Sequence, residues 1–96
     1  HTCALLSTGA VKCWGNNGFG QLGDATSGTD RLTPVAVSGL SSGVTAISTS
    51  GSHTCALLST GAVKCWGNNG YGQIGDNSQT NRLTPVAVSG IPVITR

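Results

Sequence analysis

HTCALLSTGAVKCWGNNGFGQLGD, the sequence of residues 1–24, returns at residues 53–76 almost without change. Two substitutions separate the copies: Phe19 to Tyr71 and Leu22 to Ile74. A shorter block, residues 31–39, returns unchanged at residues 82–90, and the loop between the blocks is one residue shorter in the second copy. The chain is therefore one structural unit written twice.

The composition predicts an all-β protein. Of the 96 residues, 15 are Gly, Met is absent and only 8% are charged, which suits short strands joined by tight turns. The apolar runs, such as 34–37 and 44–47, are short and β-compatible, with Gly or Ser beside them. No run approaches the roughly 20 apolar residues needed to cross a bilayer, and no signal segment starts the chain. We therefore expect a soluble, mature or excised piece of protein.

The alternation of strand-forming and turn-forming residues predicts four short strands in each copy. In a first repeat, residues 1–52, we expect strands at 2–6, 10–15, 33–37 and 44–48. In a second, truncated repeat, residues 53–96, we expect strands at 54–58, 62–67, 84–88 and 93–95. Four short antiparallel strands per repeat are typical of one blade of a β-propeller.

The cysteines occupy the same two positions in each copy: Cys3, Cys13, Cys55 and Cys65. If residues 7–9 form a three-residue hairpin loop with Gly9 in the left-handed conformation, Leu5 faces Val11 and Cys3 faces Cys13. Cross-strand Cβ atoms at such a site are about 4.5 to 5.5 Å apart, within reach of a disulfide after local twist. We predict one disulfide in each copy, and with them a secreted or cell-surface location.

Metal binding is the competing interpretation of these cysteines. His1 and His53 each lie two residues before a cysteine, but the spacing lacks the tight Cys-x-x-Cys turn of zinc sites, and a cross-strand pair already accounts for both sulfur atoms. Calcium at Asp24 and Asp30 is disfavoured because Asp30 becomes Asn81 in the second copy and acidic residues are sparse. We expect neither a metal site nor a cofactor.

Four motifs occur in the same order in the chain: His-Thr-Cys-Ala-Leu, Val-Lys-Cys-Trp-Gly-Asn-Asn, Gly-Gln-Leu-Gly-Asp and Leu-Thr-Pro-Val-Ala-Val. Together they resemble the repeat of the regulator of chromosome condensation family over essentially the whole chain. The resemblance implies β-propeller-type blades of four antiparallel strands, with the strand before the His-Thr segment innermost. The version with paired cysteines resembles secreted bacterial members of the family.

The length leaves the propeller incomplete, because closed propellers contain about 4 to 8 blades and this chain holds about two. The other blades are expected from further repeats of the same protein or from other copies joined head to tail. In the second case Val93, Ile94 and Thr95 of one copy complete the blade that residues 1–15 of the next copy begin, by strand exchange. Such an assembly closes into a ring or grows into a filament. Inter-blade packing is expected from two residues: Trp14 and Trp66.

From this architecture we expect a non-enzymatic, extracellular structural or adhesive module that self-associates. The alternative is part of a secreted propeller that binds or inhibits another protein through its rim loops, since 25–30 and 77–81 differ while the framework does not. No Ser-His-Asp arrangement, phosphate-binding segment or close carboxylate pair points to catalytic residues. The 5 cations are scattered and the net charge is only +2, so neither nucleic acid nor a membrane is an expected partner.

Overall fold

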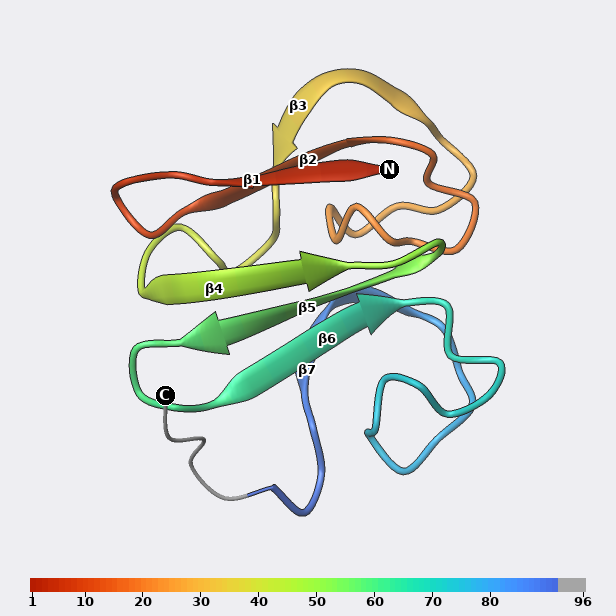
Figure 1. Ribbon diagram of the computed structural model, residues 1–96. Coiled ribbons are helices and arrows are strands. Elements are labelled where there is room, and N and C mark those ends of the chain that lie inside the picture. The colour runs from red at the N-terminus through yellow and green to blue at the C-terminus, as the bar shows by residue number, and fades with distance from the viewer. Residues whose placement is uncertain (92–96) are drawn as a thin grey trace.

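Two antiparallel sheets form the chain in a computed structural model that describes residues 1–91 (Figure 1). The first sheet has three strands in the order of the chain: β1 (Thr2–Leu5), β2 (Val11–Gly15) and β3 (Arg31–Ala36). The second has four: β4 (Val44–Thr49), β5 (His53–Leu58), β6 (Val63–Gly67) and β7 (Arg82–Ala87). The described residues contain no helix, and hence none that could cross a membrane.

The boundaries of the sheets are offset by one strand from the boundaries of the sequence repeats. The strand expected at 44–48 as the last of the first repeat is β4, but it pairs with β5 and belongs to the second sheet. The reason is local: residues 50–53 form a short turn, closed by the amide of Ser50 on the carbonyl of His53 at 3.1 Å. β4 therefore precedes the His-Thr segment at the edge of the second blade, and it belongs to the blade in which the family resemblance places it. The strand expected at 93–95, with its strand-exchange residues Val93, Ile94 and Thr95, lies outside the described residues.

The hairpin of each copy has the register that the turn residues predict. The amide of Leu6 donates to the carbonyl of Ala10 at 2.8 Å, and Gly9 is left-handed with φ of 85°. Leu5 consequently faces Val11, two pairs away from the cysteines. The second hairpin repeats this arrangement around Gly61. Cys3 faces Cys13 and Cys55 faces Cys65, as expected from the three-residue loop.

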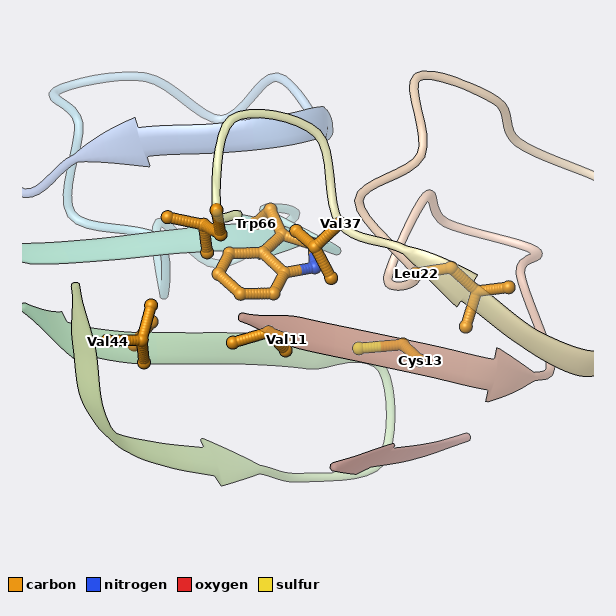
Figure 2. Close-up of a cluster of buried hydrophobic side chains, with 8 residues drawn as sticks. Val11, Cys13, Leu22, Val37, Val44 and Trp66 are labelled. Carbon is orange, nitrogen blue, oxygen red and sulfur yellow. The ribbon is translucent and has the colours of Figure 1, made fainter. Parts of the chain in front are cut away.

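The hydrophobic core lies between the two sheets rather than within either one (Figure 2). Both blades supply its fully buried members: Val11, Cys13, Leu22, Val37, Leu40, Val44, Ala56 and Trp66. A single small sheet can bury little apolar surface alone. Stacking one blade on the other therefore supplies most of the burial that stabilises this chain.

Candidate binding surfaces: the seam between the blades and the rim turns

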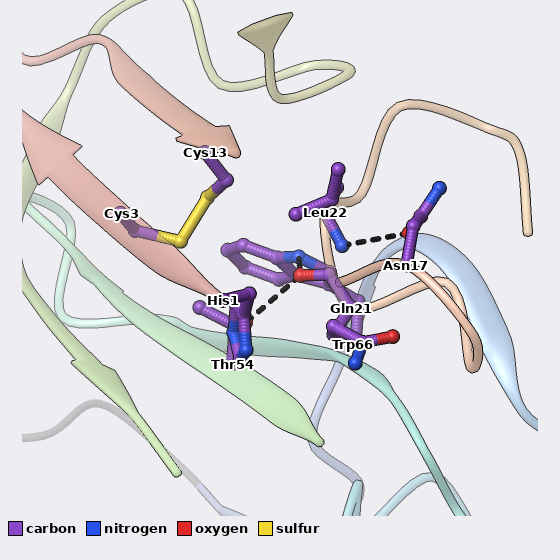
Figure 3. Close-up of a disulfide and its surroundings, with 8 residues drawn as sticks. All are labelled: His1, Cys3, Cys13, Asn17, Gln21, Leu22, Thr54 and Trp66. Atoms are coloured by element: carbon purple, nitrogen blue, oxygen red, sulfur yellow. Dashed lines mark hydrogen bonds between the residues drawn. A yellow bond between two sulfur atoms is a disulfide. The ribbon is translucent and has the colours of Figure 1, made fainter. Parts of the chain in front are cut away.

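The two disulfides lie at equivalent places but in different surroundings. Cys3–Cys13 has an S–S distance of 2.10 Å, and Cys13 is completely buried where the first blade faces the second (Figure 3). Cys55–Cys65 has an S–S distance of 2.11 Å, and its Cys55 lines an apolar groove on the far side of the second blade. No cysteine of the described chain is free. One disulfide therefore lies in an interface between blades, and the other borders a groove that stays open among residues 1–91.

The seam between the blades is centred on the backbone carbonyl of Gln21. It accepts hydrogen bonds from the indole Nε1–H of Trp66 at 2.9 Å and from the hydroxyl of Thr54 at 3.0 Å (Figure 3). The hydroxyl of Thr54 also lies 2.7 Å from Nε2 of His1. Because its single hydrogen points to Gln21, Thr54 must accept at this second contact, so Nε2 of His1 carries the proton. The seam thus contains a buried, directional network in addition to apolar packing.

Glycines in the first blade make room for the second. A Cβ at Gly20 would lie 2.3 Å from Cδ2 of Leu83, and a Cβ at Gly23 would lie 2.6 Å from Nε1 of Trp66. Both glycines also have positive φ, which L side chains rarely adopt. Beside them the amide of Ala25 donates to the carbonyl of Leu83 at 3.0 Å. Glycine is therefore required here by both space and conformation.

The predicted packing tryptophans occupy two different environments. Trp66 is completely buried in the seam, whereas Trp14, its equivalent in the first copy, is only partly buried on the outer face of the first sheet. The sequence around the two residues is identical over 1–18 and 53–70. Only the presence of a neighbouring blade distinguishes them: within the described part of the chain Trp66 faces another blade and Trp14 does not.

Each rim turn, which joins β2 to β3 in the first blade and β6 to β7 in the second, is held by one completely buried asparagine. In the first blade the Asn17 carbonyl oxygen Oδ1 accepts the amide of Leu22 at 3.1 Å. Its Nδ2 donates to the carbonyl and the hydroxyl of Thr26, at 3.1 and 2.9 Å. The backbone amide of Asn17 donates to the carboxylate of Asp30 at 2.9 Å. Through its side chain and its backbone amide, Asn17 therefore ties together the start, the middle and the end of the turn.

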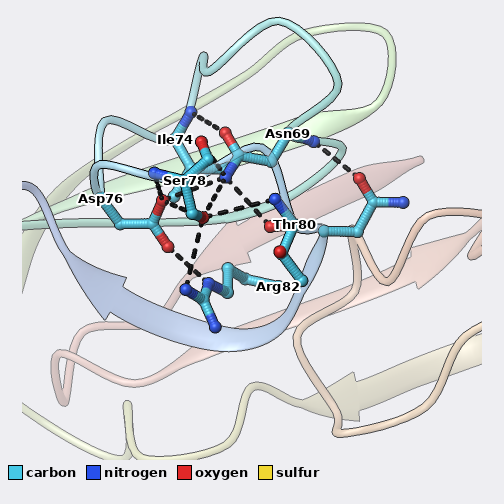
Figure 4. Close-up of polar contacts among 7 residues, drawn as sticks. Asn69, Ile74, Asp76, Ser78, Thr80 and Arg82 are labelled. Atoms are coloured by element: carbon cyan, nitrogen blue, oxygen red, sulfur yellow. Dashed lines mark hydrogen bonds and ion pairs between the residues drawn. The ribbon is translucent and has the colours of Figure 1, made fainter.

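The second blade repeats the clamp with different loop residues (Figure 4). Oδ1 of Asn69 accepts the amide of Ile74 at 2.9 Å, and Nδ2 donates to Asp76 and to the carbonyls of Ser78 and Thr80 at 3.0 to 3.1 Å. The Asn-Gly pairs at 17–18 and 69–70 predict tight turns but not the direction of the asparagine side chain, so the sequence alone does not reveal these buried, multiply bonded groups.

The aromatic residue of each turn points away from the clamp. Phe19 is 42% exposed and Tyr71 is 92% exposed. Their backbone amides donate to the side-chain oxygens of Gln21 at 2.8 Å and Gln73 at 2.9 Å, which fixes the backbone at the tip. Each rim turn thus presents one large apolar side chain on an ordered backbone.

A carboxylate closes each turn onto the strand that follows it, β3 in the first blade and β7 in the second. Asp76 accepts from Ser78, Asn69 and Arg82, and the hydrogen bond from the Ser78 hydroxyl leads in lowering the pKa of Asp76 to about 2. Burial alone would raise the pKa of Asp24, but the bonds from Thr26 and Arg31 outweigh it and hold that pKa below its usual value. Within residues 1–91 no three His, Cys, Asp or Glu side chains gather as a metal site would require. The carboxylates are instead engaged in closing the turns.

Two stacked antiparallel blades with this seam define the chain as a segment of a β-propeller. The family model of the "Regulator of chromosome condensation (RCC1) repeat" matches residues 8–57 and 60–95, and a second model of the same repeat matches residues 44–73. The chain therefore belongs to the RCC1 repeat family.

Curated relatives share the repeat within much longer proteins. The chain is 34% identical over 87 residues to "Probable E3 ubiquitin-protein ligase HERC4" of Homo sapiens, covering 88% of this chain and 8% of that protein. It is 39% identical over 92 residues to "RCC1 domain-containing protein RUG3, mitochondrial" of Arabidopsis thaliana, covering 94% and 20%. The chain thus spans only a small part of the length of these relatives.

Solved structures show the same blade architecture. Human WBSCR16 superimposes with a TM-score of 0.85 at 23% identity, covering 98% of this chain and 25% of that one. Yeast RCC1 (Prp20), in its complex with Kap60, gives a TM-score of 0.82 at 19% identity, with 98% and 25% coverage. At this level of identity the similarity establishes the fold, which is that of RCC1 propeller blades.

Proposed function

We propose that this pair of blades belongs to a non-enzymatic, extracellular propeller that binds another protein through its rim turns. The observation that carries the proposal is the rigid presentation of one exposed aromatic residue per turn, Phe19 and Tyr71, by the clamps of Asn17 and Asn69. Large aromatic residues fixed in place lose little conformational entropy on binding, and they are enriched among the residues that dominate protein interfaces.

The composition of the rim turns supports a protein partner. Residues 16–30 and 68–81 are rich in Asn, Gly, Ser and Thr around a single aromatic residue. This mixture of rigid anchors and adaptable polar groups is typical of antibody binding loops. The two turns differ mainly in their distal parts, 25–30 and 77–81, which would adjust specificity while the clamps keep the frame constant.

Proteins with the same fold give further support. One solved structure holds yeast RCC1 (Prp20) bound to Kap60, and another, of Prp20p, is described with its binding properties to Gsp1p and histones. The location proposed for this chain rests on its two disulfides, which persist in oxidising compartments such as the extracellular space.

Paired capture experiments test the rim. Immobilised wild-type chain and a Phe19→Ala/Tyr71→Ala double variant are exposed to the same extracellular protein fraction, and the proteins retained are then purified and titrated individually. We expect at least one that loses about 30-fold or more in affinity with the double variant, the effect of removing interface anchors. The control is Lys12→Ala, an exposed residue on β2 that is not part of a rim turn. Equal binding by all three chains would contradict the proposal.

Self-association into a ring or filament is the second candidate function, that of a structural or adhesive module. The specific observation is the edge of the first sheet. Within the described residues β1 is an edge strand, whereas β5, its equivalent in the second sheet, pairs with β4 on that side. An added strand would complete the first sheet with main-chain hydrogen bonds. Light scattering of the purified chain over a range of concentrations tests this function, which requires a mass that grows with concentration.

A further inference from the structure

Each rim turn ends in an arginine whose side chain is held by the carboxylate of the same turn. Nε of Arg31 donates to Oδ2 of Asp24 at 3.1 Å, and Nε of Arg82 donates to Oδ2 of Asp76 (Figure 4). The aspartate side chains are almost buried, at 9% and 8% exposure, whereas both arginine side chains are 37% exposed. One edge of each guanidinium is therefore fixed by a carboxylate, and the remainder of the group is left for other contacts.

Most N–H groups of the two guanidiniums have no partner in the protein. A guanidinium carries five N–H donors in one plane, four of them on Nη1 and Nη2. Within residues 1–91, neither Nη atom of Arg31 makes a hydrogen bond, and Arg82 makes one such bond, from Nη2 to the hydroxyl of Ser78 at 3.3 Å. The nitrogens without a partner are not buried. The terminal edge, where Nη1 and Nη2 each keep an N–H group, is therefore unoccupied in both copies.

The arginines have the same surroundings in both blades. Leu32 is 94% exposed and its equivalent Leu83 is partly buried, because Leu83 lies against Gly20 of the neighbouring blade. Arg31 and Arg82, one residue earlier in each copy, are nevertheless equally exposed. The presentation of the guanidinium is therefore a property of the rim turn itself and does not depend on which blades lie beside it.

We propose that the terminal edges of Arg31 and Arg82 bind carboxylate side chains of an acidic segment in the protein partner. Two parallel N–H groups of a guanidinium match the two oxygens of a carboxylate, and such charge-assisted pairs are stronger than neutral hydrogen bonds. Since Asp24 and Asp76 already hold the guanidiniums in place, little side-chain entropy is lost on binding. These two sites belong to the rim binding proposed above, on which the inference rests, and they add the chemistry of the partner.

The balance of charge favours single carboxylates over a polyanion. Each arginine charge on the rim is offset by the aspartate that holds it. Binding of nucleic acid requires clustered cations that give a strongly positive surface, and the net charge of the chain is only +2. A single carboxylate instead needs only the fork of N–H donors in the right orientation.

The two turns differ in one charge beside the arginine. Asp30 precedes Arg31, whereas Asn81 precedes Arg82. Through Oδ1 both residues accept the backbone amide of the clamp asparagine, at 2.9 Å in the first turn and 2.8 Å in the second. The geometry is thus the same, while the carboxylate of Asp30 opposes an incoming anion. Arg82 is therefore the stronger of the two carboxylate sites.

A titration with defined peptides, followed by nuclear magnetic resonance, tests the proposal. The probe is Gly-Ser-Glu-Glu repeated three times, and its control has Gln in place of every Glu. We expect the glutamate peptide to shift the Nε–H signals of Arg31 and Arg82, with Arg82 responding at the lower concentration, and to leave the amide signals of Lys12 and Lys64 in place. The affinity should fall as the NaCl concentration rises.

Three results of this titration would overturn the proposal. The first is equal binding of the glutamine peptide, and the second is equal shifts at Lys12, Lys64 and the two arginines. The third is tighter binding of a galacturonate oligomer, whose carboxylates belong to a polysaccharide, because it would remove the assignment to a protein partner.

Replacing the arginines by lysine separates the fork from the charge. The double variant Arg31→Lys/Arg82→Lys keeps the net charge of +2 and a cation for each aspartate, but it lacks the planar pair of donors. It should bind the glutamate peptide about 10-fold more weakly or worse, with a urea midpoint that shows an intact fold. Lys12→Gln lowers the net charge by one at an exposed position of β2 and should bind as the wild type does. A double variant that binds as tightly as the wild type, or an equal loss in Lys12→Gln, overturns the proposal.

Asp30→Asn is a second variant, and it should fold as the wild type because Asn81 makes the same hydrogen bond at the equivalent position. It should raise the affinity for the glutamate peptide by about 2-fold, and an unchanged affinity would overturn the assignment of Arg31. Protein capture that depends on Phe19 and Tyr71, by a chain that does not bind the peptide, would refute the carboxylate sites and leave rim binding intact. Peptide binding without capture of any protein would do the reverse.

Discussion

The repeat supplies its own controlled experiment, because one substitution can be made at two positions with the same local sequence. Trp66→Phe removes the indole from the seam between the blades, where its Nε1–H donates to the carbonyl of Gln21 at 2.9 Å and none of its surface is exposed. Trp14→Phe makes the same change on the partly buried outer face of the first blade. We expect the first variant to lose far more stability than the second.

The structure sets the size of the difference. Loss of the hydrogen bond costs about 1 kcal/mol, since the Gln21 carbonyl keeps its second donor, Thr54, and is not left unpaired. The smaller ring adds about 1 to 2 kcal/mol for the space left in a packed core. Trp66→Phe should therefore lower the free energy of unfolding by about 2 to 3 kcal/mol. At Trp14, where neither effect applies in the single chain, the loss should be about 0.5 kcal/mol or less.

Urea unfolding followed by circular dichroism measures both values, at protein concentrations low enough to keep the chain monomeric. With a slope of about 1 to 1.5 kcal/mol per molar urea, the midpoint should fall by about 2 M for Trp66→Phe and by less than about 0.5 M for Trp14→Phe. Equal shifts would refute the reasoning, because they would mean that the seam contributes nothing beyond the local environment of the indole. A slope that changes with the substitution would instead indicate loss of two-state unfolding.

Replacing Cys55 and Cys65 together by Ala should lower the free energy of unfolding by about 2 to 3 kcal/mol, the loop-closure entropy of cysteines 10 residues apart. An unchanged urea midpoint relative to the oxidised wild type would contradict that role. The depressed pKa of Asp76, about 2 against an ordinary value of 3.8, means that its ionised form stabilises the fold fully above about pH 4 and that this contribution is lost as the pH falls toward 2. Asp76→Asn should therefore be less stable than the wild type at neutral pH, and its free energy of unfolding should change less between pH 4 and pH 2. If the free energies of unfolding of the two proteins fall in parallel over this range, Asp76 does not have this role. Asn69→Ala leaves the amide of Ile74 without its acceptor, and it should cost about 2 to 4 kcal/mol and hasten proteolysis within 70–81. A variant as resistant to protease as the wild type would show that the clamp does not order the turn.

The hairpins were predictable from sequence because their determinants are local. A three-residue loop with Gly9 in a left-handed conformation sets the register, and the register alone brings Cys3 opposite Cys13. The turn at Asn17 was also predictable, since Asn-Gly favours tight turns. The burial of its side chain was not, because the partners that hold it, Leu22 and Thr26, are brought within reach only after the whole loop has folded back.

By itself the sequence determined the two repeats, the strand-and-turn pattern and the pairing of cysteines, all of which depend on contacts between residues close along the chain. Only the tertiary structure decided that Trp66 is buried while Trp14 is partly exposed. The physical reason is that burial is a property of the neighbour and not of the residue. Two copies of one local sequence take up the same backbone, but the hydrophobic free energy of each depends on whether another blade removes it from water.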